Sequence, residues 1–217
     1  MNELLLDDVS IRWISVSEMA NNVYLITDKA SGKQLLVDAA DDFPAIEELI
    51  SAASDDGPNP EIVAIATTHQ HWDHVRALAA AVEKYPVTTY AGADDMQGIA
   101  DESGVKISHP LSHGDKIQLG DVVIEAIHLR GHTPGSIAYA LVDSSGQPVI
   151  LSGDSLFPGG VGNTWKDPQR FSSLITDVAE RIFGRFPDQT KVFPGHGSTT
   201  DLGTERPHLD EWRARGW

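Results

Sequence analysis

The chain has 217 residues, of which 41% are hydrophobic and 22% charged, so it can bury a sizeable core and is not intrinsically disordered. Its formal net charge of -16 and its dispersed basic residues argue against nucleic-acid binding, because an acidic surface repels phosphate backbones. The absence of cysteine excludes disulfides, thiolate zinc sites and a cysteine nucleophile.

No membrane partner is expected from the hydropathy of the chain. No stretch approaches the roughly 20 consecutive apolar residues that span a bilayer. The acidic start, Met1–Asp8, lacks the basic and long apolar regions of a secretory signal. We therefore expect a cytoplasmic protein, and no oligomeric state follows from the sequence.

Hydrophobic periodicity predicts an alternation of strands and helices along the first half of the chain. The expected strands are Ile11–Val16, Val23–Thr27, Gln34–Val37, Glu61–Ala66 and Val87–Tyr90, and the expected helices are Phe43–Ala53, His74–Tyr85 and Asp94–Ala100. The second half begins with two hairpins, whose turns contain Gly120-Asp121 and Ser144-Ser145-Gly146.

These hairpins and the elements after them complete the predicted order. The expected strands are Lys116–Leu119, Val122–Ile127, Ile137–Val142, Val149–Leu151 and Lys191–Phe193, and the expected helices are Phe171–Phe183 and Glu205–Arg215. Strands that pair in hairpins, with helices between the groups, favour an α+β fold of mixed sheets covered by helices.

Four residues of the types that bind metal ions lie within six positions, in His69-Gln70-His71-Trp72-Asp73-His74, directly after the predicted strand Glu61–Ala66. Residues i and i+2 of an extended or turning backbone point to the same side, so His69 and His71 can bind one ion together. We assign His132, which lies in a later glycine-flanked turn, to the same ion.

Asp73 and His74 lie where the chain changes direction, so they can bind a second ion beside the first. We assign His196, in the turn Pro194-Gly195-His196-Gly197, to this second ion. A carboxylate can present one oxygen to each of two metals, and we assign this bridging role to Asp154. Asp73 and Asp154 are therefore the candidate catalytic carboxylates.

A ligand set of imidazoles and carboxylates suits two divalent ions, with zinc favoured and iron or manganese also compatible. A bridging water would lose a proton readily, because one zinc ion alone can lower the pKa of bound water to about 7. Such a cluster keeps positive charge after it forms hydroxide. We therefore expect a small-molecule substrate and favour an anionic one.

The other histidines and the tryptophans are expected to have structural roles. We expect surface or structural positions for His109, His113, His128 and His208, and burial for Trp72, Trp165, Trp212 and Trp217. Ser152, Ser155 and Thr133 are candidates for hydrogen bonds to the metal ligands. Trp165, Lys166 and Arg170 are candidates for shaping a substrate pocket.

The motifs together resemble the metallo-β-lactamase-fold hydrolase superfamily, and within it the glyoxalase II (hydroxyacylglutathione hydrolase) group. The resemblance rests on the histidine run, on Gly131–Ser136, on Ser152–Phe157 and on Pro194–Gly197, which occur in the expected order. It implies a four-layer αββα sandwich of two mixed sheets flanked by helices, with the metal site at one edge of the sheets. We expect a single hydrolase domain over residues 1–217, without an additional glutathione-binding helical domain.

Several branches of this superfamily are disfavoured by single residues. The flavodiiron branch has glutamate in place of His71, and the best-known β-lactamase subclass uses a cysteine ligand. Another β-lactamase subclass lacks the bridging carboxylate that Asp154 would supply. Hydrolysis of a thioester, or of a related ester or lactone, is therefore the expected activity, with a metal-bridging hydroxide as the nucleophile.

Two alternatives to this hydrolase remain open. Persulfide dioxygenases are similar proteins that bind one iron, and the positions matching their ligands are His69, His132 and Asp154. A binding module with a purely structural metal is the other alternative. The loop Gly160-Val161-Gly162-Asn163 differs from the Gly-x-Gly-Arg of glyoxalase II, so thiol carriers other than glutathione and non-thiol esters also remain open.

Overall fold

Seven strands form the first sheet of the computed structural model, which describes residues 1–216. Their order across the sheet follows the chain: β1 (Asn2–Leu5), β2 (Val9–Val16), β3 (Asn21–Asp28), β4 (Lys33–Val37), β5 (Glu61–Ala66), β6 (Thr88–Gly92) and β7 (His109–Leu111). The first four strands pair antiparallel and the pairs from β4 to β7 are parallel. The carboxyl ends of β4, β5 and β6 therefore meet at one edge.

Six strands form the second sheet, in the order β15-β14-β11-β10-β9-β8. Their bounds are β8 (Lys116–Leu119), β9 (Val122–His128), β10 (Ile137–Val142), β11 (Pro148–Gly153), β14 (Lys191–Pro194) and β15 (Thr200–Asp201). The central pair, β11 and β14, is parallel, so both strands end on the same side. A small separate hairpin joins β12 (Leu156–Phe157) to β13 (Gly160–Val161).

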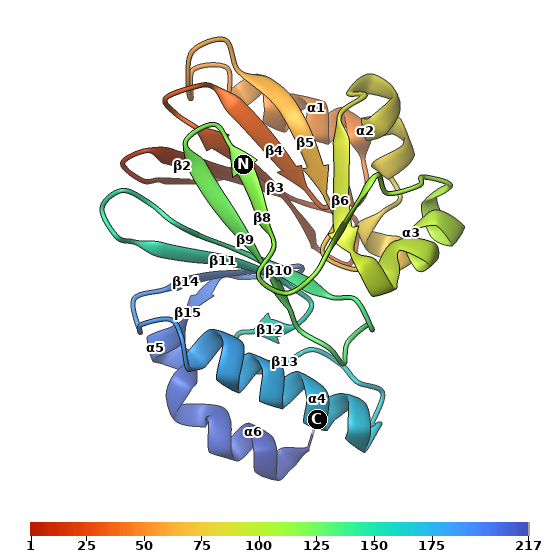
Figure 1. Ribbon diagram of the computed structural model, residues 1–217, viewed down its shortest axis with the longest axis vertical. Helices are drawn as coiled ribbons and strands as arrows, with labels where there is room; N and C mark the ends of the chain where they lie inside the picture. The colour runs from red at the N-terminus through yellow and green to blue at the C-terminus, as the bar shows by residue number, and fades with distance from the viewer. Residues whose placement is uncertain (217) are drawn as a thin grey trace.

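Helices cover the outer face of each sheet, as Figure 1 shows. On the first sheet lie α1 (Phe43–Ala52), α2 (Leu78–Lys84) and α3 (Met96–Ser103), with short 3₁₀ turns η1 (Trp72–His74) and η2 (Ala93–Asp95) between them. On the second lie α4 (Pro168–Val178), its π-helical continuation η3 (Ala179–Phe183), α5 (Leu202–Glu205), η4 (Arg206–His208) and α6 (Leu209–Arg215). The expected αββα sandwich is confirmed.

Three layers of buried apolar side chains hold the sandwich together. Tyr139 and Phe193 lie in the layer between the two sheets. Leu78 belongs to the layer between the first sheet and its helices, and Leu174 and Trp212 to the layer under the helices of the second sheet. Full burial of one such large apolar side chain stabilises the fold by about 1.5–3 kcal/mol, so the layers fix how the two sheets lie against each other.

Several of the predicted helices have different bounds in the structure, and for two of them the cause is visible. The helix expected over His74–Tyr85 begins at Leu78, because the amides of Arg76 and Ala77 donate to the carbonyls of Ala40 and Ala39 instead of entering a helical ladder. The helix expected over Glu205–Arg215 is divided into shorter segments. Pro207 has no amide hydrogen and lies at the start of the 3₁₀ turn that separates them.

The structure also corrects the expected burial of the tryptophans. Trp212 is buried as predicted, but Trp72 and Trp165 are 48% and 51% exposed, so the prediction was wrong for both. Trp217 lies outside the described residues. The strands β1 and β7 were not predicted, because each is short and lacks a run of alternating apolar residues. Within residues 1–216, no helix is long and apolar enough to cross a membrane.

Candidate functional site

The strand ends of both sheets bring the predicted ligands to one edge of the sandwich. The run His69–His74 follows β5, His132 lies in the loop between β9 and β10, Asp154 follows β11, and His196 follows β14. Because β11 and β14 pair in parallel, their ends lie side by side, and the Gly195 amide donates to the Gly153 carbonyl at 2.9 Å.

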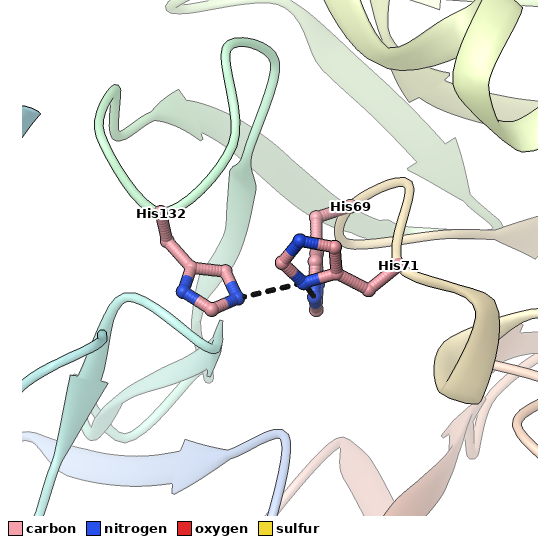
Figure 2. Close-up of side chains that lie close together, drawn as sticks. All are labelled: His69, His71 and His132. Atoms are coloured by element: carbon pink, nitrogen blue, oxygen red, sulfur yellow. Dashed lines mark hydrogen bonds between the residues drawn. The ribbon is translucent and has the colours of Figure 1, made fainter. Parts of the chain in front are cut away.

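Three imidazoles form the first group of converging side chains (Figure 2). Nδ1 of His71 lies 3.0 Å from Nε2 of His69 and 2.9 Å from Nε2 of His132. These three residues are the set that the sequence assigned to one ion, and their nitrogens lie within the mutual distance that a shared ion requires. The rings of His69 and His132 are buried.

Asp73, His74 and His196 form the second group. Nε2 of His74 lies 3.1 Å from Nε2 of His196 and 3.6 Å from Oδ2 of Asp73. Asn21 donates to the same Asp73 oxygen at 2.9 Å, which fixes the orientation of this carboxylate.

Asp154 lies between the two groups. Its Oδ2 is 3.5 Å from Nε2 of His132, in the first group, and 3.4 Å from Nε2 of His196, in the second. Its Oδ1 is 3.5 Å from Nε2 of His74. Asp154 Oδ1 is buried and has no hydrogen-bond partner within residues 1–216, which is costly for a carboxylate oxygen unless a cation binds it.

The other nitrogen of each buried ring shows where its hydrogen lies. Nδ1 of His132 donates to the Asn163 carbonyl at 2.9 Å. Nδ1 of His69 faces the Thr68 hydroxyl, whose own hydrogen is donated to Asp38. In the neutral imidazole a hydrogen on Nδ1 leaves Nε2 as a bare acceptor. The bare nitrogens of both rings therefore face Nδ1 of His71, an arrangement that fits a cation among the three rings.

The second group is held in the same way. Nδ1 of His74 donates to Oδ2 of Asp38 at 3.0 Å, and Nδ1 of His196 donates to the Met19 carbonyl at 2.9 Å. Such partners orient metal-binding imidazoles and select the tautomer that leaves Nε2 toward the metal. The residues present therefore fit two neighbouring cations, with Asp154 available to both.

The pKa values divide the histidines of the protein without metal into two classes. Burial lowers the pKa of His69 well below its ordinary value and that of His132 to about 4, so both rings are neutral near pH 7. Burial also lowers the pKa of His196, but hydrogen bonds to Asp154 and Asp73 outweigh it and raise the pKa to about 10. Asp154 and Asp73 thus stabilise the positively charged form of His196, and a metal ion can take the place of this charge.

The two candidate carboxylates are both held in the ionised form. Burial raises the pKa of Asp154, but its hydrogen bond with His196 and the other nearby histidines lower it further. The same balance, with the His196 hydrogen bond as the largest opposing effect, lowers the pKa of Asp73. Two carboxylates that stay ionised are suited to binding cations and to accepting hydrogen bonds from a water.

Two buried carboxylates that support the site were not predicted. Asp38, directly after β4, accepts hydrogen bonds from the amide and hydroxyl of Thr68, both at 2.7 Å, and from His74. Asp95 accepts from the amides of Gln70, at 3.0 Å, and Gly135, at 2.7 Å. Asp95 therefore connects the loop that carries the histidine run to the loop that carries His132.

A signal for Asp38 is present in the sequence. It follows a predicted strand directly, as the histidine run does, and parallel neighbours bring such positions together. Of the expected supporting hydroxyls, Thr133 bonds Asp95 rather than a predicted ligand, and Ser152 bonds the Leu156 carbonyl. Ser155 Oγ has no hydrogen-bond partner within residues 1–216.

A cavity of about 630 Å³ opens beside the first group, and both His71 and His132 line it. Trp165 and Arg170, expected to shape a pocket, also line this cavity. The histidines expected in other roles, His109, His113, His128 and His208, are absent from the ligand groups found within residues 1–216.

Comparison with known proteins places these features in a family. The family model of the metallo-β-lactamase superfamily matches residues 16–199. The probable metallo-hydrolase YqgX of Bacillus subtilis is 31% identical over 200 residues, which cover 86% of this chain and 89% of the relative. The cytoplasmic hydroxyacylglutathione hydrolase of Arabidopsis thaliana is 31% identical over 185 residues, covering 82% of this chain and 64% of the relative.

Solved structures show the same architecture. A metallo-β-lactamase from Staphylococcus aureus superposes with a TM-score of 0.78 at 21% identity, over 95% of this chain and 63% of the other. ETHE1 from Myxococcus xanthus gives 0.75 at 25% identity, over 94% and 84%. TTHA1623, solved in a di-iron-bound form, gives 0.69 at 29% identity, over 90% and 96%. The chain belongs to the metallo-β-lactamase superfamily, and its curated relatives include metallo-hydrolases and hydroxyacylglutathione hydrolases.

Proposed function

We propose that the protein is a hydrolase of thioesters, or of closely related esters and lactones, with two divalent metal ions in its active site. The observation that carries this proposal is the position of Asp154 between two histidine groups, with one buried oxygen that receives no hydrogen bond from residues 1–216. The di-iron form of TTHA1623, 29% identical over 96% of that chain, supports a site for two ions.

His69, His71 and His132 would hold one ion and Asp73, His74 and His196 the other, with Asp154 shared by both. Zinc is the metal we favour, since a site of imidazoles and carboxylates suits it, and iron and manganese are the alternatives. When bound, the two ions would supply Lewis-acid polarisation of the substrate carbonyl and activation of a water molecule.

Asp73 and Asp154 have the catalytic roles in this proposal. Because their pKa values are lowered, both remain ionised and can accept a hydrogen bond from the attacking water, which orients it toward the carbonyl. Asn21 holds Asp73, and Asp154 is fixed by the end of β11. Buried, preoriented carboxylates need no rearrangement when the water attacks.

The leaving group is proposed to be a thiolate because of the side chains around the cavity. Apart from the metal-binding histidines, its lining within residues 1–216 consists of amide, hydroxyl, arginine, tryptophan, proline and glycine groups, without a carboxyl, lysine or tyrosine side chain. A thiolate leaves without protonation because its conjugate acid has a pKa of about 8.5, whereas an amine requires a general acid. The relatives named hydroxyacylglutathione hydrolase favour the same bond.

A substrate panel with matched variants tests this proposal. The purified protein should hydrolyse acyl thioesters, and Asp154→Ala should lower kcat/KM by orders of magnitude while the circular dichroism spectrum stays that of the wild type. Asp28→Ala, which removes a buried carboxylate at the turn between β3 and β4, controls for general damage. Full thioester hydrolysis by an Asp154→Ala protein shown to lack its second ion would contradict the two-metal mechanism.

A persulfide dioxygenase with one iron is the second candidate, and the structural similarity to ETHE1 favours it. His69, His132 and Asp154 would be its ligands. It predicts one iron per chain and oxygen uptake with a glutathione persulfide, without thioester hydrolysis. Turnover of β-lactams, or of none of these substrates, would instead support a β-lactamase or a non-enzymatic module.

A further inference from the structure

The cavity beside the first histidine group has a wall of unusual composition. His71 and His132 lie on one side of it, and Trp165 and Arg170 lie next to them. The Trp165 ring stacks on His132, with centroids 5.3 Å apart and planes inclined by 28°, and meets the His71 ring edge-on at 5.5 Å. A ligand in this cavity would therefore contact both the tryptophan and two proposed metal ligands.

Arg170, in the first turn of α4, carries the unneutralised positive charge of this wall. Its Nε donates to the Gly131 carbonyl at 2.7 Å and its Nη2 to the His132 carbonyl, and its guanidinium carbon lies 4.4 Å from the centre of the Trp165 ring. No carboxylate of residues 1–216 forms an ion pair with it. In a chain with a net charge of -16, an arginine left without an acid at a cavity is unusual.

Arg130 lines the same cavity but differs in this respect. Its Nε and Nη2 bind the two oxygens of Asp177 at 2.8 and 2.7 Å, so it is held in a bidentate ion pair, although Arg181 also approaches the same carboxylate at 3.3 Å. The two arginines therefore provide a comparison within one cavity. Arg170 has no acid partner within residues 1–216, whereas Arg130 is held by Asp177.

Trp165 is held in its exposed position by a constrained loop. Trp165 and Lys166 have φ values of 54° and 61°, in the left-handed region that residues other than glycine rarely adopt. The Trp165 amide donates to Oδ1 of Asn163 at 2.8 Å, and the carbonyl of Asn163 binds His132. Strained backbone of this kind persists where surrounding contacts determine it, and it clusters at ligand sites.

We propose that this cavity is a subsite for a carboxylate-bearing arm of the substrate, in which Arg170 pairs with the carboxylate and Trp165 packs against the adjoining apolar part. This inference rests on the proposed function for its substrate. A carboxylate matches the site better than a phosphate, because one guanidinium with two of its N–H groups already bound to carbonyls can neutralise a single charge.

Paired thioesters that differ in one group test the subsite through a ratio of rates. The S-acetyl ester of 3-mercaptopropionate is compared with that of 3-mercaptopropanamide, and a succinyl monothioester with its terminal amide. The first pair places the carboxylate on the thiol arm and the second on the acyl arm. We expect the wild type to prefer the acid of one pair by about tenfold to a hundredfold in kcat/KM, the range of one hydrogen-bonded charge pair.

Two arginine variants separate charge from loop support. Arg170→Gln should reduce the acid-to-amide ratio to near one, whereas Arg170→Lys should retain part of it. Arg130→Gln should leave the ratio at the wild-type value, since that charge is already paired. General damage to the centre lowers both members of a pair alike, so the ratio isolates the charge. A ratio near one in the wild type, or a wild-type ratio in Arg170→Gln, would overturn the proposal.

A binding measurement keeps this test separate from the proposed activity. Calorimetric titration of the metal-loaded protein with 3-phenylpropionate and 3-phenylpropanamide should show tighter binding of the acid, and Arg170→Gln should lose this preference. Any direct binding of the acid to the metal contributes equally in the wild type and in Arg170→Gln, so the difference between the two proteins reports on Arg170. If no thioester is hydrolysed but the preference depends on Arg170, the proposed function fails and the subsite stands. Equal preference in both proteins refutes the subsite itself.

Discussion

Replacement of Asp38 tests whether the site depends on a buried carboxylate that touches no substrate. Asp38 is 1% exposed and accepts three hydrogen bonds, two from Thr68 and one from His74. At about 1.5–3 kcal/mol for each bond to a charged acceptor, the three would sum to about 4.5–9 kcal/mol. The bonds share one carboxylate whose burial is itself unfavourable, so we expect Asp38→Ala to cost about 3–5 kcal/mol of unfolding free energy.

Asp38→Asn separates stability from metal binding. Asparagine keeps the volume and one acceptor oxygen, so its cost should be smaller, about 1–3 kcal/mol. When the amide nitrogen faces His74 it donates to Nδ1, and the ring hydrogen must then move to Nε2, the atom that faces the proposed ion. We therefore expect metal affinity to fall about tenfold to a hundredfold.

Urea unfolding of chelator-treated protein measures the first effect, and competition with a chromophoric chelator measures the second. Asp28→Asn is the matched control. Asp28 is also buried and accepts hydrogen bonds from the Ala30 and Asp121 amides and the Ser31 hydroxyl, but it is the last residue of β3, next to the turn to β4. The Asp28→Asn variant should therefore lose stability and keep the metal affinity of the wild type. If Asp38→Asn binds metal as tightly as the wild type, the inferred tautomer control of His74 is wrong.

Three further predictions concern the site loop, the pH dependence of stability and the protons released by metal. Gly162→Ala should lower the free energy of unfolding by about 1–3 kcal/mol and reduce metal loading, because its Cβ would lie 1.7 Å from the Asp154 carbonyl oxygen. The control Gly146→Ala has open space around its Cβ, so metal analysis should show unchanged loading. Burial raises the pKa of Asp56, but the hydrogen bonds that it accepts from Arg12 have a larger effect and lower the pKa below the ordinary value. The stability that this ion pair contributes is therefore present above the ordinary aspartate pKa of about 3.9 and is lost as the pH falls through the lower folded value. In urea melts, the difference between wild type and Asp56→Asn should therefore be about 1–3 kcal/mol at pH 7 and shrink toward pH 3, and a difference independent of pH would refute the role of this ion pair. Because the pKa of His196 is raised to about 10 without metal, metal binding at pH 7 should displace its proton, seen as a dependence of the calorimetric heat on the buffer, and equal heats in buffers of different ionisation enthalpy would contradict this.

The fold class could be predicted because the strongest local signals agree with the final architecture. The hairpin turns at Gly120-Asp121 and Ser144-Ser145-Gly146 join β8 to β9 and β10 to β11 as expected. The short strands β1 and β7 were missed because their pairing partners, rather than their own patterns, determine them. The start of α2 was missed for a similar reason, since distant carbonyls capture the amides that precede it.

The candidate ligands could be predicted because each follows a strand-like segment, and strand ends gather at one edge of a sheet. The groups that orient them could not be found in the same way. Asp95 is the last residue of η2, directly before α3, and its connection of two loops depends on how that segment packs. The exposure of Trp165 was also missed, because composition favours burial of tryptophan while the strained loop directs this ring toward the cavity.

Metal stoichiometry combined with turnover tests the central claim most directly. Chelator-treated protein is titrated with zinc, and bound metal per chain and hydrolysis of an acyl thioester are measured at each addition. The proposed site predicts two ions per chain in the wild type, with activity that appears as the second ion binds, and one ion per chain with little activity in Asp154→Ala. Full activity at one ion per chain, or oxygen uptake with a single iron and no thioester hydrolysis, would contradict it.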